Sequence, residues 1–147
     1  MKLLNGITGF YEKQNEPPNI DGKQFKSLCF SILNQNEGTV LEFQEPQVAT
    51  NFFAMEVNVS NKHFHILLNA HYPFLAFAST VNLSEIIFID DPQLKEVFSP
   101  FYRVLSTKEL NEPLLIKNVN ELNSAELNQL AYWKPERIGD VIFNHWD

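Results

Sequence analysis

The chain is poor in the residues that carry covalent and metal chemistry. It contains one cysteine, Cys29, among 147 residues, so neither an internal disulfide nor a cysteine-based zinc site can form. A single thiol is typical of a reducing compartment, and we expect the protein to be cytoplasmic. Cys29 falls on the apolar side of a predicted helix, which indicates a packing role rather than a nucleophile.

Common motifs of catalysis and cofactor binding are also missing. The five glycines are spread singly along the chain, so no glycine-rich loop is available to hold a phosphate or a dinucleotide. No G-x-S-x-G, S-x-x-K or H-E-x-x-H sequence occurs. We therefore predict no cofactor and favour a protein that is not an enzyme.

Positive charge is sparse. Eleven Lys and Arg stand against 18 Asp and Glu, which gives a net charge of −7, and no basic run occurs. Binding to nucleic acid rests on a basic patch, so we expect none. No apolar stretch approaches the ~20 residues that span a bilayer, so we expect no membrane association. The acidity suits a basic protein partner, and solubility alone is the simpler explanation.

What the chain does have is alternating apolar residues through its middle. A period of two between Thr39 and Asp90 predicts strands near residues 39–44, 52–59, 62–71, 74–78 and 86–89. Their connections are too short for parallel crossovers, so we expect antiparallel pairing. The run from Phe74 to Ala78 is apolar on both faces. It predicts a central strand that is covered on both sides or that meets a partner.

Helix signals flank these strands. Asp21 and Gln24 have the spacing of a capping box before an apolar stripe, which predicts a helix over residues 21–34. Similar boxes predict short helices after Ser106 and Asn123, the latter burying Leu127, Leu130 and Ala131. A further short helix is expected after the capping residue at position 91 and the proline that follows it.

Two terminal segments are predicted to be strands. Residues 6–12 are expected to form a short edge strand, and the alternation over residues 141–146 predicts that the chain ends in a strand docked in the sheet. The whole chain, residues 1–147, is thus predicted to be a single α+β domain. It has a five- or six-stranded, mostly antiparallel sheet, one long N-terminal helix on one face and short C-terminal helices.

Two histidines on one predicted strand are candidate metal ligands. His63 and His65 lie two residues apart on the same face, which is about 6.6 Å at the usual strand rise. With a carboxylate from a neighbouring strand, such as Glu56 or Glu42, they would form a metal site, and a metal-dependent enzyme is one alternative function. A solvated sheet face is the ordinary role for these residues.

Four aromatic residues are candidate interface anchors, because Trp and Tyr are enriched among the residues that dominate binding energy. They are Trp133, Tyr132, Tyr102 and Trp146. Core packing is the alternative role for each. The leading hypothesis is a non-enzymatic protein-binding module that meets a protein partner of basic character, as a monomer or a homodimer.

The end of the chain supports a sharper form of this hypothesis. The stretch Trp133-Lys134-Pro135, followed by Gly139 to Asp147, resembles the ends of small acidic bacterial proteins of the immunity type. This resemblance covers about 15 of the 147 residues. It implies a small α+β binder that occludes a toxin, and it transfers no catalytic residue.

A second resemblance is to type III secretion chaperones, which are also small, acidic and α+β, and which dimerise. Those chaperones usually end on a helix. Because this chain is predicted to end on a strand, the chaperone-like alternative ranks below the immunity-type one.

Overall fold

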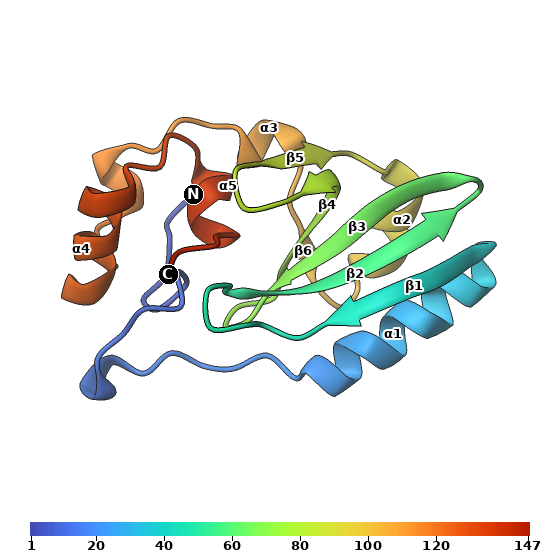
Figure 1. The fold of residues 1–147 in the computed structure, drawn as a ribbon, viewed down its shortest axis with the longest axis horizontal. Coiled ribbons are helices and arrows are strands. Elements are labelled where there is room, and N and C mark those ends of the chain that lie inside the picture. The colour runs from blue at the N-terminus through green and yellow to red at the C-terminus, as the bar shows by residue number, and fades with distance from the viewer.

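Alternating apolar residues form the strands of one sheet, as the sequence predicts. The computed structural model describes residues 1–147. Five strands follow one another across the sheet in chain order and pair antiparallel: β1 (Gly38–Gln44), β2 (Phe52–Val59), β3 (Lys62–Asn69), β4 (Phe74–Val81) and β5 (Ile86–Ile89). A sixth, β6 (Arg103–Val104), pairs parallel with the start of β4. The predicted α+β class with a mostly antiparallel sheet is confirmed (Figure 1).

Helices begin at the predicted capping residues. The long helix is α1 (Gly22–Gln35), and the shorter ones are α2 (Pro92–Phe98), α3 (Thr107–Leu110), α4 (Ser124–Trp133) and α5 (Ile138–Ile142), with 3₁₀ turns η1 (Lys13–Asn15) and η2 (Ile116–Asn118). The side chains of Asp21, Asp91, Ser106 and Asn123 each accept a hydrogen bond from a backbone N–H in the first turn. None of the helices combines the length and apolarity needed to cross a membrane.

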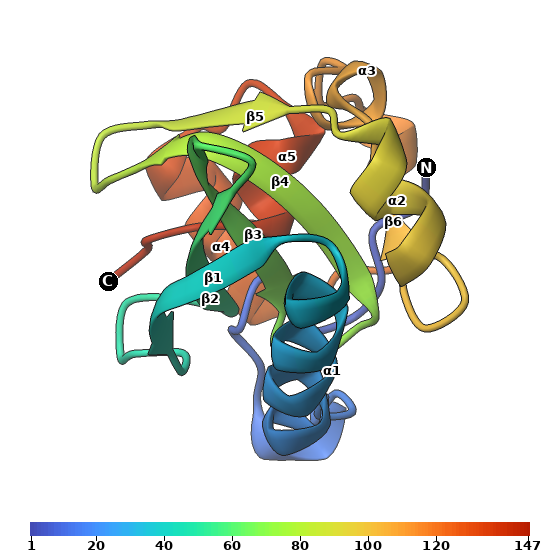
Figure 2. The ribbon, with the colours of Figure 1, turned by 90° about the vertical axis from the view of Figure 1, so that its right-hand side faces the viewer.

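Apolar side chains on the two faces of the sheet form two separate cores. On one face, residues of α1 and α2 such as Phe25 and Phe98 pack on β2, β3 and β4 (Figure 2). On the other face, the N-terminal segment and α5 pack on Phe52, Leu67 and Ala76. Strand β4 supplies both cores and is buried from residue 74 to residue 78. The prediction of a central strand covered on both sides is therefore confirmed.

Strand β1 does not keep the strict alternation predicted for it. The register with β2 shifts between Val40 and Glu42, which is a β-bulge at Leu41. As a result Val40 and Phe43 both pack on the core that α1 and α2 cover (the α1 core), and Leu41 is 51% exposed.

The prediction of an edge strand over residues 6–12 is wrong. The segment is a series of turns in which Gly6 and Gly9 have φ values of +82° and +91°, a conformation that glycine adopts without strain. Leu3, Ile7 and Thr8 are nevertheless buried. The segment packs as irregular backbone, so its polar groups need partners other than a neighbouring strand.

Buried asparagine side chains supply those partners. Asn51 and Asn69, at the ends of β2 and β3, both donate to the carbonyls of Ile7 and Ile142. Asn144, which is 4% exposed, donates to the carbonyl of Thr8. These amides tie the first residues, the sheet and the last helix together without a strand ladder.

The predicted C-terminal strand is also wrong. Residues 138–142 form the short helix α5. In its first turn the N–H of Asp140 donates to the carbonyl of Arg137, and the N–H of Arg137 donates to the carboxylate of Asp140. Gly139 allows this helix to approach β5 closely, because a Cβ there would lie 2.6 Å from the ring of Phe88. The end of the chain is docked, as expected, with Phe143 and Trp146 buried. The last residues, 143–147, follow α5 as irregular backbone, so the chain ends neither on the predicted strand nor on a helix.

Helix α4 lies at the far end of the molecule from the tip of the β2–β3 hairpin, beside the N-terminal segment (Figure 1). It was predicted to bury Leu127, Leu130 and Ala131, but Leu127 is 44% exposed and Glu126 is the residue that is fully buried. The carboxylate of Glu126 accepts hydrogen bonds from the N–H groups of Gly6 and Thr8 and from the Thr8 hydroxyl. A polar contact with the turns of the N-terminal segment thus positions α4.

Candidate functional site

A cleft of about 430 Å³ lies where three segments far apart in the sequence meet. Its walls are the β4–β5 turn (residues 82–86), the connection from α4 to α5 (residues 133–136), and the end of the chain around residues 143–146. Asp140 of α5 completes the lining. We call it the tryptophan cleft, because Trp133 and Trp146 both line it. Its volume is in the range of ligand sites, about 300–1,000 Å³.

The two tryptophans lie against each other although 12 residues separate them. Their rings are nearly parallel, at 4°, with centroids 6.4 Å apart. The ring of Tyr132 meets Trp133 edge-on at 5.1 Å. Trp146 is buried, whereas Trp133 and Tyr132 are 39% and 76% exposed. Leu83, in the β4–β5 turn, adds a side chain that is 84% exposed to the apolar lining of the cleft.

Carboxylates line the same cleft. Asp140 is paired with Arg137 at 2.6 Å, whereas Glu85 and Glu136 take part in no ion pair. No side chain of the protein donates a hydrogen bond to the carboxylates of these two glutamates, and both residues are exposed. Lys134 is the one lysine in the lining. The cleft therefore presents two carboxylates that form no ion pair with any cation of the protein.

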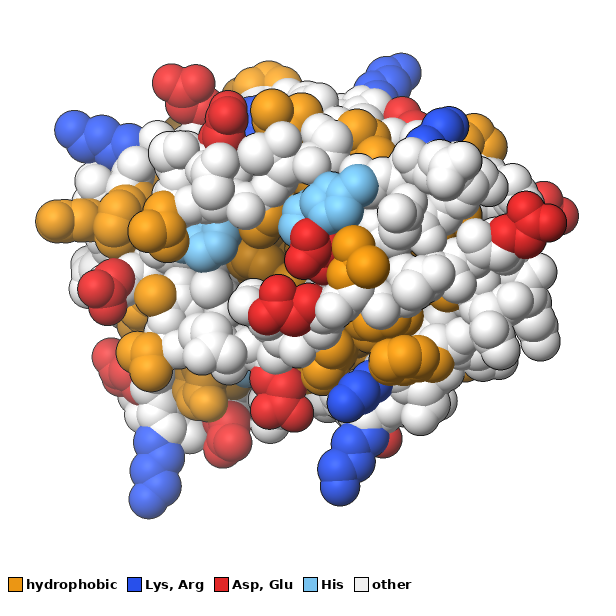
Figure 3. Space-filling model, turned by 45° about the vertical axis from the view of Figure 1, so that its right-hand side comes forward, with side chains coloured by type: hydrophobic (Ala, Val, Ile, Leu, Met, Phe, Trp, Pro, Cys, Tyr) orange, Lys and Arg blue, Asp and Glu red, His pale blue; other side chains and the backbone are white.

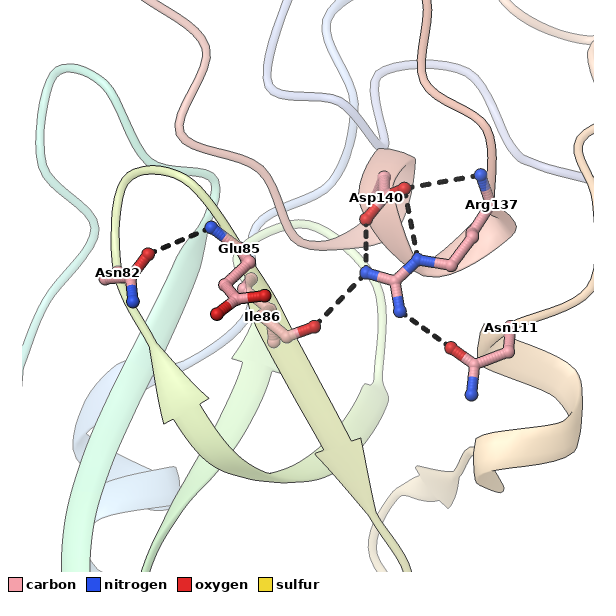
Figure 4. Close-up of polar contacts among 6 residues, drawn as sticks. All are labelled: Asn82, Glu85, Ile86, Asn111, Arg137 and Asp140. Atoms are coloured by element: carbon pink, nitrogen blue, oxygen red, sulfur yellow. Dashed lines mark hydrogen bonds and ion pairs between the residues drawn. The ribbon is translucent and has the colours of Figure 1, made fainter.

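The walls of the cleft are held in place by polar contacts (Figure 4). In the β4–β5 turn the side chain of Asn82 accepts from the N–H of Glu85. Behind the cleft, Arg137 bonds to Asp140, to the side chain of Asn111 and to the carbonyl of Ile86, which joins α5 to α3 and β5. These contacts fix the shape of the cleft within the fold itself.

The backbone at the α4 C-terminus turns through a left-handed residue. Lys134 has φ 51° and ψ 55°, and its N–H bonds to the carbonyl of Leu130. This turn places Trp133 and Pro135 on the cleft wall. A lysine in this conformation costs about 1 kcal/mol relative to the glycine usually found there.

The interface candidates Tyr132, Trp133 and Trp146 are brought together, but Tyr102 is not among them. Tyr102 lies in the α1 core, 8% exposed, with its ring against Phe25 at a centroid distance of 5.9 Å. Burial raises the pKa of its hydroxyl to about 12. Tyr102 thus packs in the core, which is the alternative role considered for it from the sequence, and it does not line the tryptophan cleft.

The metal candidates lie on the open face of β2 and β3. His63 Nε2 bonds to Glu56 Oε2 at 2.5 Å, and the rings of His63 and His65 are edge-on with centroids 5.5 Å apart. Burial lowers the pKa of His65, against a smaller raising effect of Glu56. No group of three or more His, Cys, Asp or Glu side chains is arranged to hold a metal ion. Figure 3 shows histidine and acidic side chains side by side on this part of the surface.

His145 connects this face to the tryptophan cleft. It lines the cleft and also a smaller hollow of about 140 Å³ beside His65 and Val81. Its ring meets Phe52 edge-on at 5.3 Å, and burial lowers its pKa. The open sheet face and the cleft are thus one continuous surface.

Sequence reasoning did not identify Glu85, Glu136 or Lys134 as site residues. Glutamate and lysine are common on any surface, and only the fold brings the β4–β5 turn against residues about fifty positions later. The aromatic content of the end of the chain was the one signal available.

Comparison of the chain with protein-family models, with curated proteins and with solved structures found no match in any of the three.

Proposed function

We propose that this protein is a non-enzymatic protein-binding module whose tryptophan cleft receives a basic segment of a partner protein. The observation that carries the proposal is the combination, in one cleft, of exposed aromatic side chains with two glutamates that have no ion pair. Aromatic anchors supply contact area, and carboxylates without partners select positive charge.

Charge on the whole molecule acts in the same direction. At a net charge of −7 the protein attracts a basic partner over distances greater than those of direct contact. The cleft adds specificity at short range, because a neutral or acidic segment would leave Glu85 and Glu136 desolvated without a counter-charge. Association should therefore weaken as the salt concentration rises.

The sharpest form of the proposal is an immunity-type protein that occludes a toxin. The residues that carry the resemblance, 133–135 and 139–147, supply eight of the 14 residues that line the cleft. The resemblance and the cleft thus fall on the same part of the molecule, which supports a role for this stretch in binding.

A pull-down from lysate of the native host tests the proposal. Three baits are compared: wild type, the cleft variant Glu85→Gln/Glu136→Gln, and the control Glu16→Gln/Glu96→Gln. The control removes the same charge at two exposed glutamates outside the cleft that make no ion pair. Wild type and control should retain the same basic protein at stoichiometric yield, with or without EDTA, and the cleft variant should lose it. Equal retention by all three baits would reject the cleft as the binding site.

A further inference from the structure

The way in which this protein holds its own arginines indicates what the tryptophan cleft accepts. The chain has two arginines, and both lie over an aromatic ring while pairing with a carboxylate. The guanidinium carbon of Arg137 is 5.3 Å from the centroid of Phe88, and Arg137 pairs with Asp140 at 2.6 Å. Arg103 lies 5.8 Å from the centroid of Phe74 and pairs with Glu109 at 3.0 Å.

None of the nine lysines is held in this way. Lys26 lies over Phe43 at 5.3 Å but pairs with no carboxylate, and no lysine takes part in an ion pair. The difference follows from the chemistry of the two cations. A guanidinium is planar and weakly hydrated, so it can stack on a ring while it donates two parallel hydrogen bonds to a carboxylate, whereas an ammonium is a compact, strongly hydrated charge.

The tryptophan cleft contains the same two kinds of group without an arginine between them. Trp133 is 39% exposed, and an indole is the aromatic ring that attracts cations most strongly. Glu85 and Glu136 line the same cleft, and neither is in an ion pair. The neighbouring arginine, Arg137, is already committed to Asp140, Asn111 and Ile86.

We propose that the tryptophan cleft holds an arginine side chain of the partner, with its guanidinium over the indole of Trp133 and its N–H groups bonded to the carboxylates of Glu85 and Glu136. This inference rests on the proposed function and gives the basic partner a specific chemical group. It also distinguishes arginine from lysine, which net charge alone does not.

The chain offers a clean probe for this proposal. It contains only two tryptophans, and both line the cleft, so each of the two indole N–H signals in a ¹H–¹⁵N spectrum reports on this site. The labelled protein is titrated at constant ionic strength with N-acetyl-arginine amide, with N-acetyl-lysine amide and with N-acetyl-citrulline amide. Citrulline has nearly the shape of arginine but carries no charge.

Arginine amide should shift the Trp133 indole signal saturably, lysine amide should bind more weakly, and citrulline amide should cause no saturable shift. In the cleft variant Glu85→Gln/Glu136→Gln the affinity for arginine amide should fall about tenfold or more, the change expected for the loss of one charge-assisted hydrogen bond. The control Glu16→Gln/Glu96→Gln should keep wild-type affinity.

Three results would overturn the proposal: no saturable shift with arginine amide, a lysine affinity equal to that for arginine, or a response to citrulline equal to that for arginine. Each would leave the protein-binding function itself standing, since the loss of the partner by the cleft variant in the pull-down is measured separately. The converse outcome is a cleft that binds arginine amide in the titration together with a wild-type bait that retains no protein in the pull-down. That pair of results would reject the proposed function and support only a small-molecule site.

Discussion

Replacement of Glu126 by alanine should be among the most destabilising single changes in this protein. Glu126 is fully buried, and its carboxylate accepts five hydrogen bonds. The donors are the N–H of Gly6 at 2.7 Å, the N–H and hydroxyl of Thr8 at 3.0 and 2.7 Å, and the N–H and side-chain amide of Asn123 at 3.2 and 3.0 Å. Alanine leaves the buried donors of Gly6 and Thr8 without partners.

The size of the effect follows from those donors. A buried N–H group that loses its partner costs about 1–3 kcal/mol, and a hydrogen bond to a charged group contributes about 1.5–3 kcal/mol. Allowing for some relaxation of the turns, the free energy of unfolding should fall by about 3–5 kcal/mol in Glu126→Ala. For a chain of this length the corresponding fall in Tm is about 10–15 °C. Glu126→Gln keeps one acceptor oxygen and leaves mainly the Thr8 N–H unpaired, so its loss should be about 2 kcal/mol.

Urea unfolding followed by tryptophan fluorescence measures these losses, because Trp133 lies at the end of the same helix. Amide hydrogen exchange at Thr8 should quicken in both variants, and exchange at Gly6 should quicken in Glu126→Ala. Asn128→Ala is the matched control, since Asn128 is exposed on α4 and should change the stability by no more than about 0.5 kcal/mol. A Glu126→Ala protein within about 0.5 kcal/mol of wild type would refute the view that this carboxylate holds the N-terminal segment to α4.

Three further predictions concern other parts of the molecule. Lys134→Gly should raise the free energy of unfolding in urea by about 0.5–1 kcal/mol, because glycine adopts the left-handed conformation freely, while Lys134→Ala should give no gain; a gain with alanine would show that the backbone conformation is not the cause. Burial lowers the pKa of His65 and of His145, so the unfolded chain binds more protons than the folded chain between these lowered values and about 6.5. Stability should therefore fall as the pH is lowered through that window, and the fall should be smaller in His65→Gln/His145→Gln; identical pH profiles would contradict the assignment. Cys29 is fully buried and burial raises its pKa, so Ellman's reagent should react with it only on unfolding, and rapid reaction in the native protein would contradict its place in the core.

The sequence was most informative where a single periodicity decides burial. Strands β2 to β4 alternate or are apolar throughout, and their buried faces agree with the pattern because a sheet inverts every second side chain. Helix starts were predicted equally well, because a capping side chain such as that of Asp21 or Ser106 bonds to the first turn of its own helix and needs no distant partner.

Prediction failed where distant groups decide the local structure. Residues 6–12 form no strand ladder, and the carbonyls of Ile7 and Thr8 accept instead from the side chains of Asn51, Asn69 and Asn144 elsewhere in the chain. Residues 141–144 are all buried, so their hydrophobicity carries no period, and a helix of five residues is too short to separate from a strand. In α4 the contact of Glu126 with the N-terminal turns overrides the apolar stripe.

Of the residues that line the candidate site, the sequence pointed only to Trp133 and Trp146, and it gave nothing of the geometry. Trp133 and Trp146 were named as candidate anchors, with core packing as the alternative, yet nothing in the sequence indicates that their rings stack or that the β4–β5 turn brings Glu85 to the same cleft. In the register of β2 and β3, His63 lies opposite Asn58 and His65 lies opposite Glu56. His63 and Glu56 are therefore diagonal neighbours on the same face of the sheet, where their side chains pair. That register requires the hairpin at Ser60, which was expected from the polar break.

Site-specific photo-cross-linking in the native host tests the central claim most directly. Benzoyl-phenylalanine is placed either at Tyr132, which is 76% exposed beside the tryptophan cleft, or at Phe30, which is 48% exposed on α1. If the cleft binds a basic partner, the probe at position 132 should yield one defined cross-link to a basic protein, and the probe at position 30 should not. A cross-link from position 30 alone, or none from position 132, would contradict the account.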